Sequence, residues 1–512
     1  MRHLKHAVAA FLFAASLLNA LGVEAKVVSV EKLTESPVGT FKPGPYLRLD
    51  FRVSGDLSDD VGRIADLQRA LRSNDGKISY ATSVTLIVPA TSGAGNGTLL
   101  VDLPNRGRTL AASLFNSPRS PMLPIGSFER GNGFLQDNGF AIAVVAWELG
   151  HGIDLPTLMA EDGSPRFIEG AALAIVRDVA VFLQSNAAIE NPLRGTVRRT
   201  IGVGYSQTGR LLKSFLAGGY NAVEGRPVFS GAYIFGAAGG LINLRTLPGP
   251  ESGAGQVPTF ANPEFRGVNE EPIAIADIAK LTIGDGQAAP KMMFVNTTTD
   301  YFSGRASLGR TGADGVEDRP LPDNVRAYDI AGGSHALIPG KGDCKHAYAV
   351  LDWHPVLRAT LLMLNKWILS EEAPPPNVLM RLRAATGDAT VLQAPKHFPR
   401  GTIQVPIGDS DGNARGGIRL PDLEAPLGTH AAQNPPLSPA CSLGAAYVPF
   451  APTKEERESN GDPRPSIRER YRDLAGYKGR IEATAQALMA SGFLLPADAE
   501  EIIAAAATVV LP

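Results

Sequence analysis

Short apolar runs rich in Val, Ile and Phe alternate along the chain with stretches in which apolar residues recur every three or four positions. The first pattern is typical of buried β-strands and the second of amphipathic helices. The expected strands cover 86–88, 99–101, 140–147, 201–203, 232–235, 292–295 and 325–330, and the clearest helical stripes fall in 175–183, 211–216 and 357–368. Because strands that alternate with helices form parallel sheets, we expect an α/β fold with a mostly parallel central sheet and helices on both faces. The glycine-rich segment 93–97 predicts a hairpin between the first two strands.

The composition is that of a large globular protein without a nucleic-acid partner. The chain has 512 residues, of which 44% are apolar and 20% are charged, so it can bury a large core. The 49 basic and 51 acidic residues almost cancel, and no Lys- or Arg-rich run provides the positive surface that nucleic acid requires. We therefore exclude nucleic acid as a partner.

Two regions break the alternation of strands and helices. Residues 241–288 are rich in Gly and Pro and show little periodicity, which is typical of a long insertion, and we expect this insertion to be lid-like. A run of prolines at 374–376 ends the last helical stripe. We expect a core at 26–372 and a C-terminal extension at 373–512 that packs on the core.

The N-terminus has the features of a signal peptide. Arg2 and Lys5 precede an apolar run at 7–18, and small residues lead to Ala25, where a signal peptidase is expected to cut. We therefore expect residues 1–25 to be removed and the mature protein to be secreted or periplasmic. The apolar run is shorter than the roughly 20 residues that span a bilayer, so we expect no stable membrane span after cleavage. A retained N-terminal anchor is the alternative.

Export affects the interpretation of the two cysteines. In an oxidising compartment a pair of cysteines favours a disulfide, and Cys344 and Cys441 have no other cysteine to pair with. A metal site that combines Cys344 with His346 and His354 is the alternative, but no second Cys-rich half completes a zinc pattern. We expect the disulfide and no metal.

A serine stands between the expected strand at 201–203 and the next helical stripe, in the sequence Gly-Tyr-Ser-Gln-Thr-Gly at 204–209. A serine at such a turn presents its hydroxyl at the carboxyl edge of the sheet, and the helix N-terminus behind it favours developing negative charge. The motif departs from G-x-S-x-G, because Thr208 stands where the second glycine is usual and glycine follows one place later. We expect Ser206 to be a nucleophile; an ordinary turn with an N-capping serine is the alternative.

A nucleophilic serine needs a base and an orienting carboxylate, which follow it in this kind of fold in the order acid, then histidine. Among the histidines after Ser206, only His335 closes a strand-like run through a short turn, so we expect it to be the base. Asp300 follows the strand at 292–295 in the same way and is the expected acid, with a helix-capping role as the alternative. The substitutes for the acid lie in the polar loop before the histidine: Asp314, Asp318 and Asp323. Asp329 lies inside a strand and fits the role less well.

An acyl-transfer site also needs two backbone N–H donors for the oxyanion, one from the residue after the serine and one from the loop after an early strand. Gln207 is expected to provide the first donor. The loop after the strand at 99–101 contains Arg106 and Gly107, and we expect one of them, with Arg106 preferred, to provide the second. An ordinary turn at this loop is the alternative.

No motif in the sequence implies a cofactor. The acidic segment 409–413 is similar to a calcium loop, but Leu420 stands where such a loop has its closing Glu, so we expect a hairpin turn there. No phosphate-binding glycine motif occurs between a strand and a helix, so no nucleotide cofactor is expected.

These motifs resemble those of the alpha/beta-hydrolase superfamily, and more narrowly those of bacterial proteins called alpha/beta hydrolase domain-containing proteins. The resemblance rests on segments spread over most of the mature chain: 105–107, 204–207, 296–301, 321–325, 351–353, 417–422 and 461–466. It implies the alpha/beta-hydrolase fold, with the C-terminal extension as part of that fold, and a triad of Ser206, Asp300 and His335. Many relatives carry Glu where this chain has Asp300, and Asp preserves a carboxylate at that position.

The residues and the resemblance together predict a serine hydrolase that cleaves a small-molecule carboxylic ester through an acyl-enzyme intermediate. In this scheme Ser206 attacks, His335 transfers the proton and Asp300 orients the imidazole. Gln207 and Arg106 bind the oxyanion. An amidase or peptidase with the same triad is one alternative, and a catalytically silent binding protein is another, because fold alone does not determine function.

Overall fold

The structure is a computed structural model that describes residues 26–512 apart from 118–122, 187, 189, 243, 245, 249–271, 282–288, 386–402 and 437. The expected signal peptide lies outside the described residues, as does most of the expected insertion at 241–288. A described part of that insertion folds as α5 (Ile275–Leu281), in which Ile275 and Ile278 are buried and which packs on α4 (Gln207–Ala217). The lid-like role of the insertion stays a prediction.

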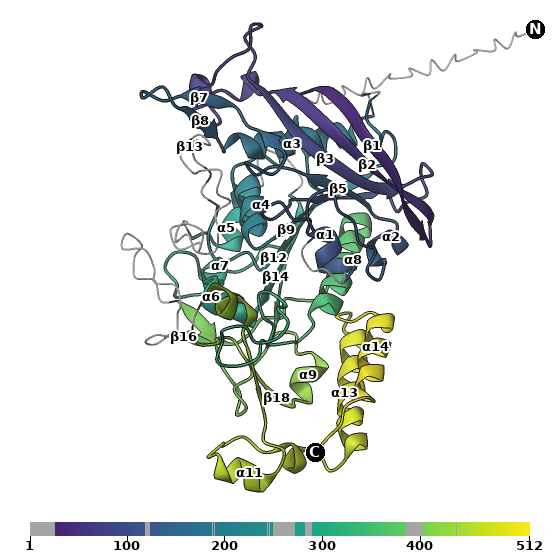
Figure 1. Ribbon diagram of the computed structural model, residues 1–512, viewed down its shortest axis with the longest axis vertical. Helices are drawn as coiled ribbons and strands as arrows, with labels where there is room; N and C mark the ends of the chain where they lie inside the picture. Colours follow the sequence, from purple (N-terminus) through teal and green to yellow (C-terminus); the bar gives the residue numbers. More distant parts are fainter. Residues whose placement is uncertain are drawn as a thin grey trace, which may run out of the picture.

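A mixed sheet, ten-stranded over the described residues, forms the centre of the molecule (Figure 1). Its main path runs β1 (Val27–Phe41), β2 (Gly44–Asp56), β3 (Ser79–Pro89), β5 (Ala141–Val145), β4 (Thr98–Asp102), β9 (Arg199–Tyr205), β12 (Gly231–Phe235), β14 (Lys291–Thr297) and β15 (Val325–Ile330), and the short β6 (Ile153–Asp154) pairs with β3. Every neighbouring pair from β5 to β15 is parallel, whereas the pairs from β1 to β5 are antiparallel. The predicted α/β sheet is confirmed, with an antiparallel extension at one edge.

The expected hairpin between the strands at 86–88 and 99–101 is wrong. β5 lies between β3 and β4, where it pairs in antiparallel register with β3 and in parallel register with β4. Between β4 and β5 the chain crosses over through α1 (Ala111–Phe115) and α2 (Phe134–Asp137). A crossover of this length allows β5 to pair in parallel with β4. In the expected hairpin, β3 would have occupied that position beside β4.

Side chains that alternate along the strands face two helical layers. Leu99 and Val101 of β4 belong to the core that includes α3 (Ala171–Gln184) and α4. Leu100 between them belongs to the core that includes α1 and α8 (His354–Ser370). Figure 1 shows α3 and α4 on one side of the central strands and α1 and α8 on the other. The sheet is therefore buried on both faces, as the sequence predicts.

The segment after α8 returns to the sheet before it forms a helical hairpin. Beside β15, the N–H of Asp329 donates to Val378 O at 2.9 Å, and the N–H of Ile418 donates to Asp329 O at 2.7 Å. Further along the chain, α13 (Leu474–Ala490) and α14 (Pro496–Ala506) pack on each other and lie beside α8 in Figure 1. Arg358 of α8 and Asp498 of α14 form a buried ion pair, with 2.6 Å between Nη2 and Oδ1. The C-terminal extension thus contacts the core through both the sheet and α8.

Smaller elements complete the described chain. The short sheets combine β7 (Thr157–Met159), β8 (Pro165–Ile168) and β13 (Thr246–Pro248); β10 (Ala222–Val223) and β11 (Arg226–Pro227); β16 (Leu382–Ala384) and β17 (Gln404–Pro406); and β18 (Gly428–Ala431) and β19 (Ala446–Pro449). The remaining α-helices are α6 (Thr298–Ser303), α7 (Ser307–Thr311), α9 (Pro421–Glu424), α10 (Pro439–Gly444), α11 (Lys454–Ser459) and α12 (Ile467–Arg470). The expected turn at 409–413 is present between the bridged residues Gly408 and Ala414. No helix in the described part of the chain is long and apolar enough to cross a membrane.

Candidate active site

Ser206 occupies the turn between β9 and α4. Its backbone angles are φ 56° and ψ −114°, a conformation that residues other than glycine rarely adopt. The Ser206 N–H donates to Phe235 O at 2.9 Å, which continues the parallel pairing of β9 with β12 up to the turn. The strand and the helix therefore hold Ser206 at the carboxyl edge of the sheet.

The glycines of this turn stand where there is no room for a side chain. A Cβ atom on Gly204 would lie 2.5 Å from Thr208 O, and one on Gly209 would lie 2.6 Å from the Cβ of Ala237. Thr208 replaces the usual glycine, and its hydroxyl accepts from Tyr205 N at 3.1 Å and donates to Tyr205 O at 3.2 Å. In this variant of G-x-S-x-G, the position that has no room for a side chain is therefore Gly209 in place of 208. The Thr208 side chain stabilises the turn through its two hydrogen bonds to Tyr205.

The structure brings Ser206, His335 and Asp300 into one hydrogen-bonded row. Ser206 Oγ lies 3.0 Å from His335 Nε2, and His335 Nδ1 lies 2.6 Å from Asp300 Oδ1. His335 is 8% exposed and Asp300 is 1% exposed, so the acid end of the row is shielded from water. When Nδ1 donates to the carboxylate, Nε2 is the ring nitrogen that accepts from the serine hydroxyl.

Asp300 is fixed at the start of α6, which follows β14 directly. Its Oδ2 atom accepts from Thr297 N at 2.6 Å and from Thr297 Oγ1 at 2.8 Å, while its Oδ1 atom faces His335. The helix-capping role considered as an alternative is therefore present together with the contact to His335. Because each role uses a different carboxylate oxygen, the cap orients Asp300 toward the imidazole.

His335 is held from several sides. The ring of Tyr205 stacks on the imidazole with 5.1 Å between the ring centroids, and the Tyr205 hydroxyl donates to His335 O. Trp353 Nε1 donates to Ser334 O at 3.1 Å in the preceding residue. A Cβ atom on Gly236 would lie only 3.2 Å from His335 Nδ1, so the loop after β12 also packs closely on the ring. These contacts fix the imidazole between Ser206 and Asp300.

The other candidate acids have different partners. Asp318 accepts from Arg310 Nε at 3.1 Å in an exposed loop. Asp329 accepts from Tyr301 Oη at 2.7 Å and from Met380 N at 2.9 Å, and burial raises the pKa of Asp329 to about 6. The exposed loop before β15 holds the remaining candidates, Asp314 and Asp323. Asp300 is the candidate acid that contacts His335.

The loop that follows β4 lies against the turn that carries Ser206. Asn105 Nδ2 donates to Tyr205 O at 3.1 Å, and Arg106 Nη1 donates to Asn105 Oδ1 at 2.8 Å. Burial lowers the pKa of the Arg106 guanidinium to about 10, and the charge of Glu148 opposes that effect. The backbone N–H of Arg106 faces the carboxyl group of Glu148. This orientation argues against the expected backbone N–H of Arg106 as an oxyanion donor and leaves the Arg106 guanidinium as the candidate group.

Gln207 is the first residue of α4, so its backbone N–H has no partner within the helix. Its side chain is directed away, and Gln207 Nε2 donates to Glu148 Oε1 at 2.9 Å. The Gln207 N–H therefore stands at a helix N-terminus next to Ser206, as the expected first oxyanion donor requires.

Asp102, at the end of β4, has a buried carboxyl group that joins the two ends of the next loop. Its Oδ2 atom accepts from the N–H groups of Leu110 and Ala111, each at 2.8 Å. Burial raises the pKa of Asp102 to about 7, and the two N–H groups oppose that effect. The carboxyl group thus fixes the start of α1 relative to β4, with the Arg106 loop between them.

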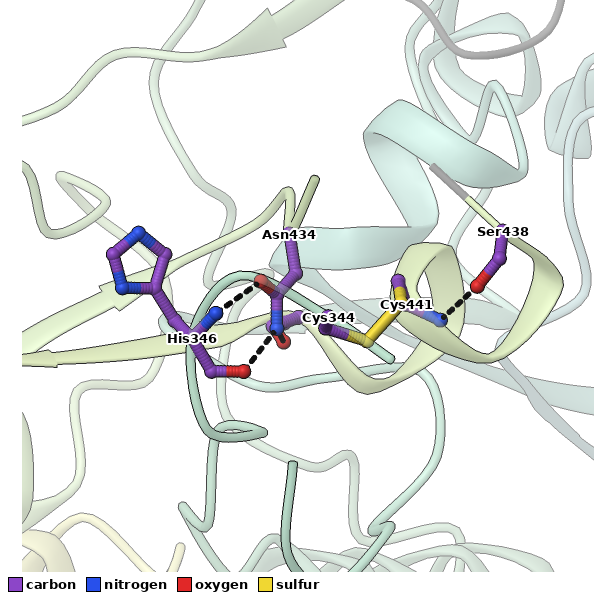
Figure 2. The surroundings of a disulfide bond; sticks show 6 residues. Cys344, His346, Asn434, Ser438 and Cys441 are labelled. Atoms are coloured by element: carbon purple, nitrogen blue, oxygen red, sulfur yellow. Dashed lines mark hydrogen bonds between the residues drawn. A yellow bond between two sulfur atoms is a disulfide. The ribbon is translucent and has the colours of Figure 1, made fainter. Parts of the chain in front are cut away.

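Cys344 and Cys441 form the expected disulfide, which Figure 2 shows with its surroundings. The bond joins the segment after His335 to α10 and closes a sequence separation of 97 positions. Close by, Ala336 N donates to Leu443 O at 3.1 Å. The disulfide and this backbone bond both tie the residues that follow His335 to the C-terminal extension.

The alternative metal site at Cys344 is contradicted by the disulfide, because a bonded sulfur is not a thiolate ligand. His346 exchanges hydrogen bonds with Asn434 instead, through its backbone N–H and its carbonyl group, each at 3.0 Å (Figure 2). His354 Nδ1 lies 2.5 Å from Asp352 Oδ1. Over the described residues, no group of three or more His, Cys, Asp or Glu side chains is arranged to hold a metal ion.

Three residues near this site were missed in the sequence: Asp102, Glu148 and Tyr205. Asp102 directly follows the expected strand at 99–101, and Glu148 directly follows the one at 140–147. Tyr205 immediately precedes the serine. Because the carboxyl ends of parallel strands meet at one edge of the sheet, a position at a strand end was the one signal in the sequence, and it does not distinguish these residues from other polar residues at strand ends.

A serine in a strained turn between a parallel strand and a helix, with an acid and a histidine that follow later strands of the same sheet, defines the alpha/beta-hydrolase class. A family model described as "Alpha/beta hydrolase domain" matches residues 147–504, which is more than half of the chain and includes Ser206, Asp300 and His335. The chain belongs to this family.

Several solved esterase structures are similar to the chain at low identity. A carbohydrate esterase family 15 glucuronoyl esterase from Caldicellulosiruptor kristjansonii has 11% identity and a TM-score of 0.32, over 70% of this chain and 85% of that chain. The rice cell wall degrading esterase LipA from Xanthomonas oryzae has 11% identity and a TM-score of 0.26, over 60% of this chain and 90% of that chain. Acetyl xylan esterase 1 from Thermoanaerobacterium sp. has 13% identity and a TM-score of 0.26, over 53% and 72%. No curated protein matches the sequence.

Proposed function

We propose that the protein is an exported serine hydrolase that cleaves carboxylic esters of small molecules through an acyl-enzyme intermediate. The observation that carries the proposal is the row in which Ser206 Oγ lies 3.0 Å from His335 Nε2 and His335 Nδ1 lies 2.6 Å from Asp300 Oδ1. The row supplies a nucleophile, a base and an orienting acid, which are the groups that acyl transfer needs. Membership of a hydrolase family supports the same reaction class.

In the acylation half of the reaction, Ser206 Oγ attacks the carbonyl carbon of the ester while its proton passes to His335 Nε2. The carbonyl oxygen becomes an oxyanion, which the Gln207 N–H and the Arg106 guanidinium bind. The bond to the alcohol oxygen then breaks, and Nε2 returns the proton to the leaving alcohol. The Asp300 carboxylate stabilises the imidazolium that forms between these steps.

In the deacylation half, His335 Nε2 takes a proton from a water molecule that attacks the acyl carbon. The second oxyanion collapses, the bond to Ser206 Oγ breaks, and Nε2 returns the proton to the serine. The carboxylic acid leaves and the site is restored. The chain's own residues supply every proton acceptor in this cycle, so the proposal includes no cofactor.

Two features support the exported location. Residues 1–25 have the charge and apolar pattern of a signal peptide. The disulfide between Cys344 and Cys441 is typical of proteins that fold in an oxidising compartment. We therefore propose that the mature protein is secreted or periplasmic.

A panel of esters and amides of increasing acyl length tests the proposed reaction, with the wild type compared with Ser206→Ala and His335→Ala. We expect ester hydrolysis in the wild type and a loss of kcat on the order of 10⁶-fold in either variant, because the two residues act as a unit. Thermal melting curves that match the wild type would show that both variants fold. Full activity in either variant would contradict the triad, and faster turnover of amides than of esters would indicate an amidase. A folded wild type that turns over no ester and no amide would indicate a binding protein.

A further inference from the structure

Glu148 places a buried carboxyl group between two elements of the proposed oxyanion site. It lies just after β5, at the carboxyl edge of the sheet, and the whole residue is only 8% exposed. Gln207, which is 2% exposed, donates from Nε2 to Glu148 Oε1 at 2.9 Å. The carboxyl group therefore contacts the residue whose backbone N–H is the proposed first oxyanion donor.

The same carboxyl group faces the loop that carries the second proposed donor. Burial raises the pKa of Glu148. Several groups oppose that effect: the hydrogen bond from Gln207, the charges of His151 and Arg106, and the backbone N–H of Arg106. The Arg106 backbone thus lies near the Glu148 carboxyl group, whose Oε2 atom has no hydrogen-bond partner of its own among the described residues. A single buried side chain thus lies beside both residues that carry the proposed donors, Gln207 and Arg106, which belong to different elements.

The residues around Glu148 hold the Arg106 loop as well. Trp147 Nε1 donates to Pro104 O at 2.7 Å, at the start of that loop. Gly107 has a φ of 71°, and a Cβ atom there would lie 2.4 Å from His151 Nδ1, so the loop packs closely against the histidine ring. Segment 147–151, which includes Glu148, therefore packs against the Arg106 loop through Trp147 and His151.

We propose that Glu148 is a positioning residue that holds Gln207 and Arg106 in the geometry that binds the oxyanion. The inference rests on the proposed function, because it assigns a role only if Ser206 forms a tetrahedral intermediate. The physical reason is that an oxyanion donor is effective only when it is fixed before charge develops. Gln207 donates to Glu148 Oε1, and the Arg106 loop lies near the same carboxyl group, so Glu148 links the start of α4 to the loop after β4.

Glu148→Gln is the variant that tests this role, because it keeps the size of the side chain. The amide group of glutamine has one acceptor oxygen where the carboxylate has two. Its NH₂ group would therefore face either Gln207 Nε2 or the Arg106 N–H, so that two donors oppose each other. Complete loss of one oxyanion donor costs about 10² to 10³-fold in kcat, and we expect misplacement to cost at least about tenfold with KM little changed. The affinity for a trifluoromethyl ketone, which forms a tetrahedral adduct with the serine, should fall in parallel.

The double variant Glu148→Gln with Gln207→Glu provides the rescue. The exchanged side chains restore a carboxylate–amide hydrogen bond with the opposite polarity and return an acceptor oxygen to the Arg106 N–H. We expect this double variant to recover most of the kcat and ketone affinity that Glu148→Gln loses, and the recovery measures the coupling between the two residues. Glu161→Gln, on an exposed turn, is the matched control and should behave as the wild type.

All rates are expressed per serine titrated with a fluorophosphonate, so that partial unfolding does not count as a loss of kcat. Wild-type kcat and ketone affinity in Glu148→Gln, together with an inactive Ser206→Ala, would overturn the role of Glu148 and leave the proposed function intact. An active Ser206→Ala would overturn the proposed function itself. If Glu148→Gln fails to fold, the double variant decides: near wild-type kcat supports the role, and a folded double variant with a loss of about tenfold or more contradicts it.

Discussion

Tyr205 binds His335 in two ways at once. Its ring stacks on the imidazole with 5.1 Å between the centroids, and its hydroxyl donates to the backbone carbonyl group of the same histidine. Tyr205 immediately precedes Ser206, so the residue before the nucleophile holds the proposed base. This contact links the end of β9 to the segment after β15 across β12 and β14.

Tyr205→Phe should weaken the positioning of His335 while it keeps the stacked ring. A hydrogen bond of this kind contributes about 1 kcal/mol, which corresponds to about a fivefold loss of kcat. Steady-state kinetics of ester hydrolysis measures this loss, and KM should change little because the Tyr205 hydroxyl donates to the backbone of His335. A kcat equal to that of the wild type would mean that the stacking and packing around His335 are sufficient.

Asp300→Asn should lower kcat by about 10³ to 10⁴-fold, which is less than the loss on the order of 10⁶-fold expected without the serine. An amide at this position no longer stabilises the imidazolium and favours the wrong tautomer of His335. Because the Asp300 cap of α6 is also weakened, stability should fall by about 1 kcal/mol. Asp318→Asn is the control in the exposed loop, and a larger loss of kcat there would reassign the acid.

Asp102→Asn should make stability less sensitive to pH between about 4 and 7. The pKa of Asp102 is raised to about 7 in the folded protein and is about 3.9 in an unfolded chain. Between these values the folded state holds a proton that the unfolded state lacks, so the wild type loses stability from this group as pH rises toward 7. Asparagine carries no charge and keeps an acceptor oxygen for the N–H groups of Leu110 and Ala111.

Urea unfolding at several pH values measures the effect. The difference in unfolding free energy between Asp102→Asn and the wild type should move in favour of the variant as pH rises, by at most about 1.4 kcal/mol per pKa unit. A difference that is constant across this range would show that Asp102 keeps an ordinary pKa in the folded protein.

Replacing Cys344 and Cys441 with serine should reduce both stability and activity. A disulfide that closes 97 positions stabilises the fold by about 4 to 5 kcal/mol on loop-entropy grounds. Activity should fall as well, because the bond restrains the segment after His335. Urea unfolding with and without a reductant gives the first quantity, and kinetics below the unfolding transition give the second. Alkylation of both cysteines in the non-reduced exported protein would contradict the structural role.

The central strands and the row of Ser206, Asp300 and His335 could be predicted because their signals are local. Each strand is a short apolar run, and each of the three residues follows such a run through a short turn. The pairing of β5 with β3 and β4 could not be predicted from neighbouring residues, since register depends on contacts between distant segments. The hairpin expected at 86–101 failed for this reason.

The residues that support the site were harder to find. Glu148 has its proposed role because Gln207 and Arg106 approach it from separate elements. Asp102 has its role because α1 begins beside its carboxyl group. In the sequence both look like ordinary polar residues at the ends of strands. Their burial and their hydrogen-bond partners are tertiary properties, which local patterns do not encode.

Everything proposed for this site depends on Ser206 being a nucleophile that His335 activates. The most direct test is to treat the mature protein with a fluorophosphonate and to map the adduct by mass spectrometry. We expect one adduct on Ser206 that is absent in Ser206→Ala and forms far more slowly in His335→Ala. A folded protein that forms no adduct, or an adduct on another residue that persists in Ser206→Ala, would contradict this expectation.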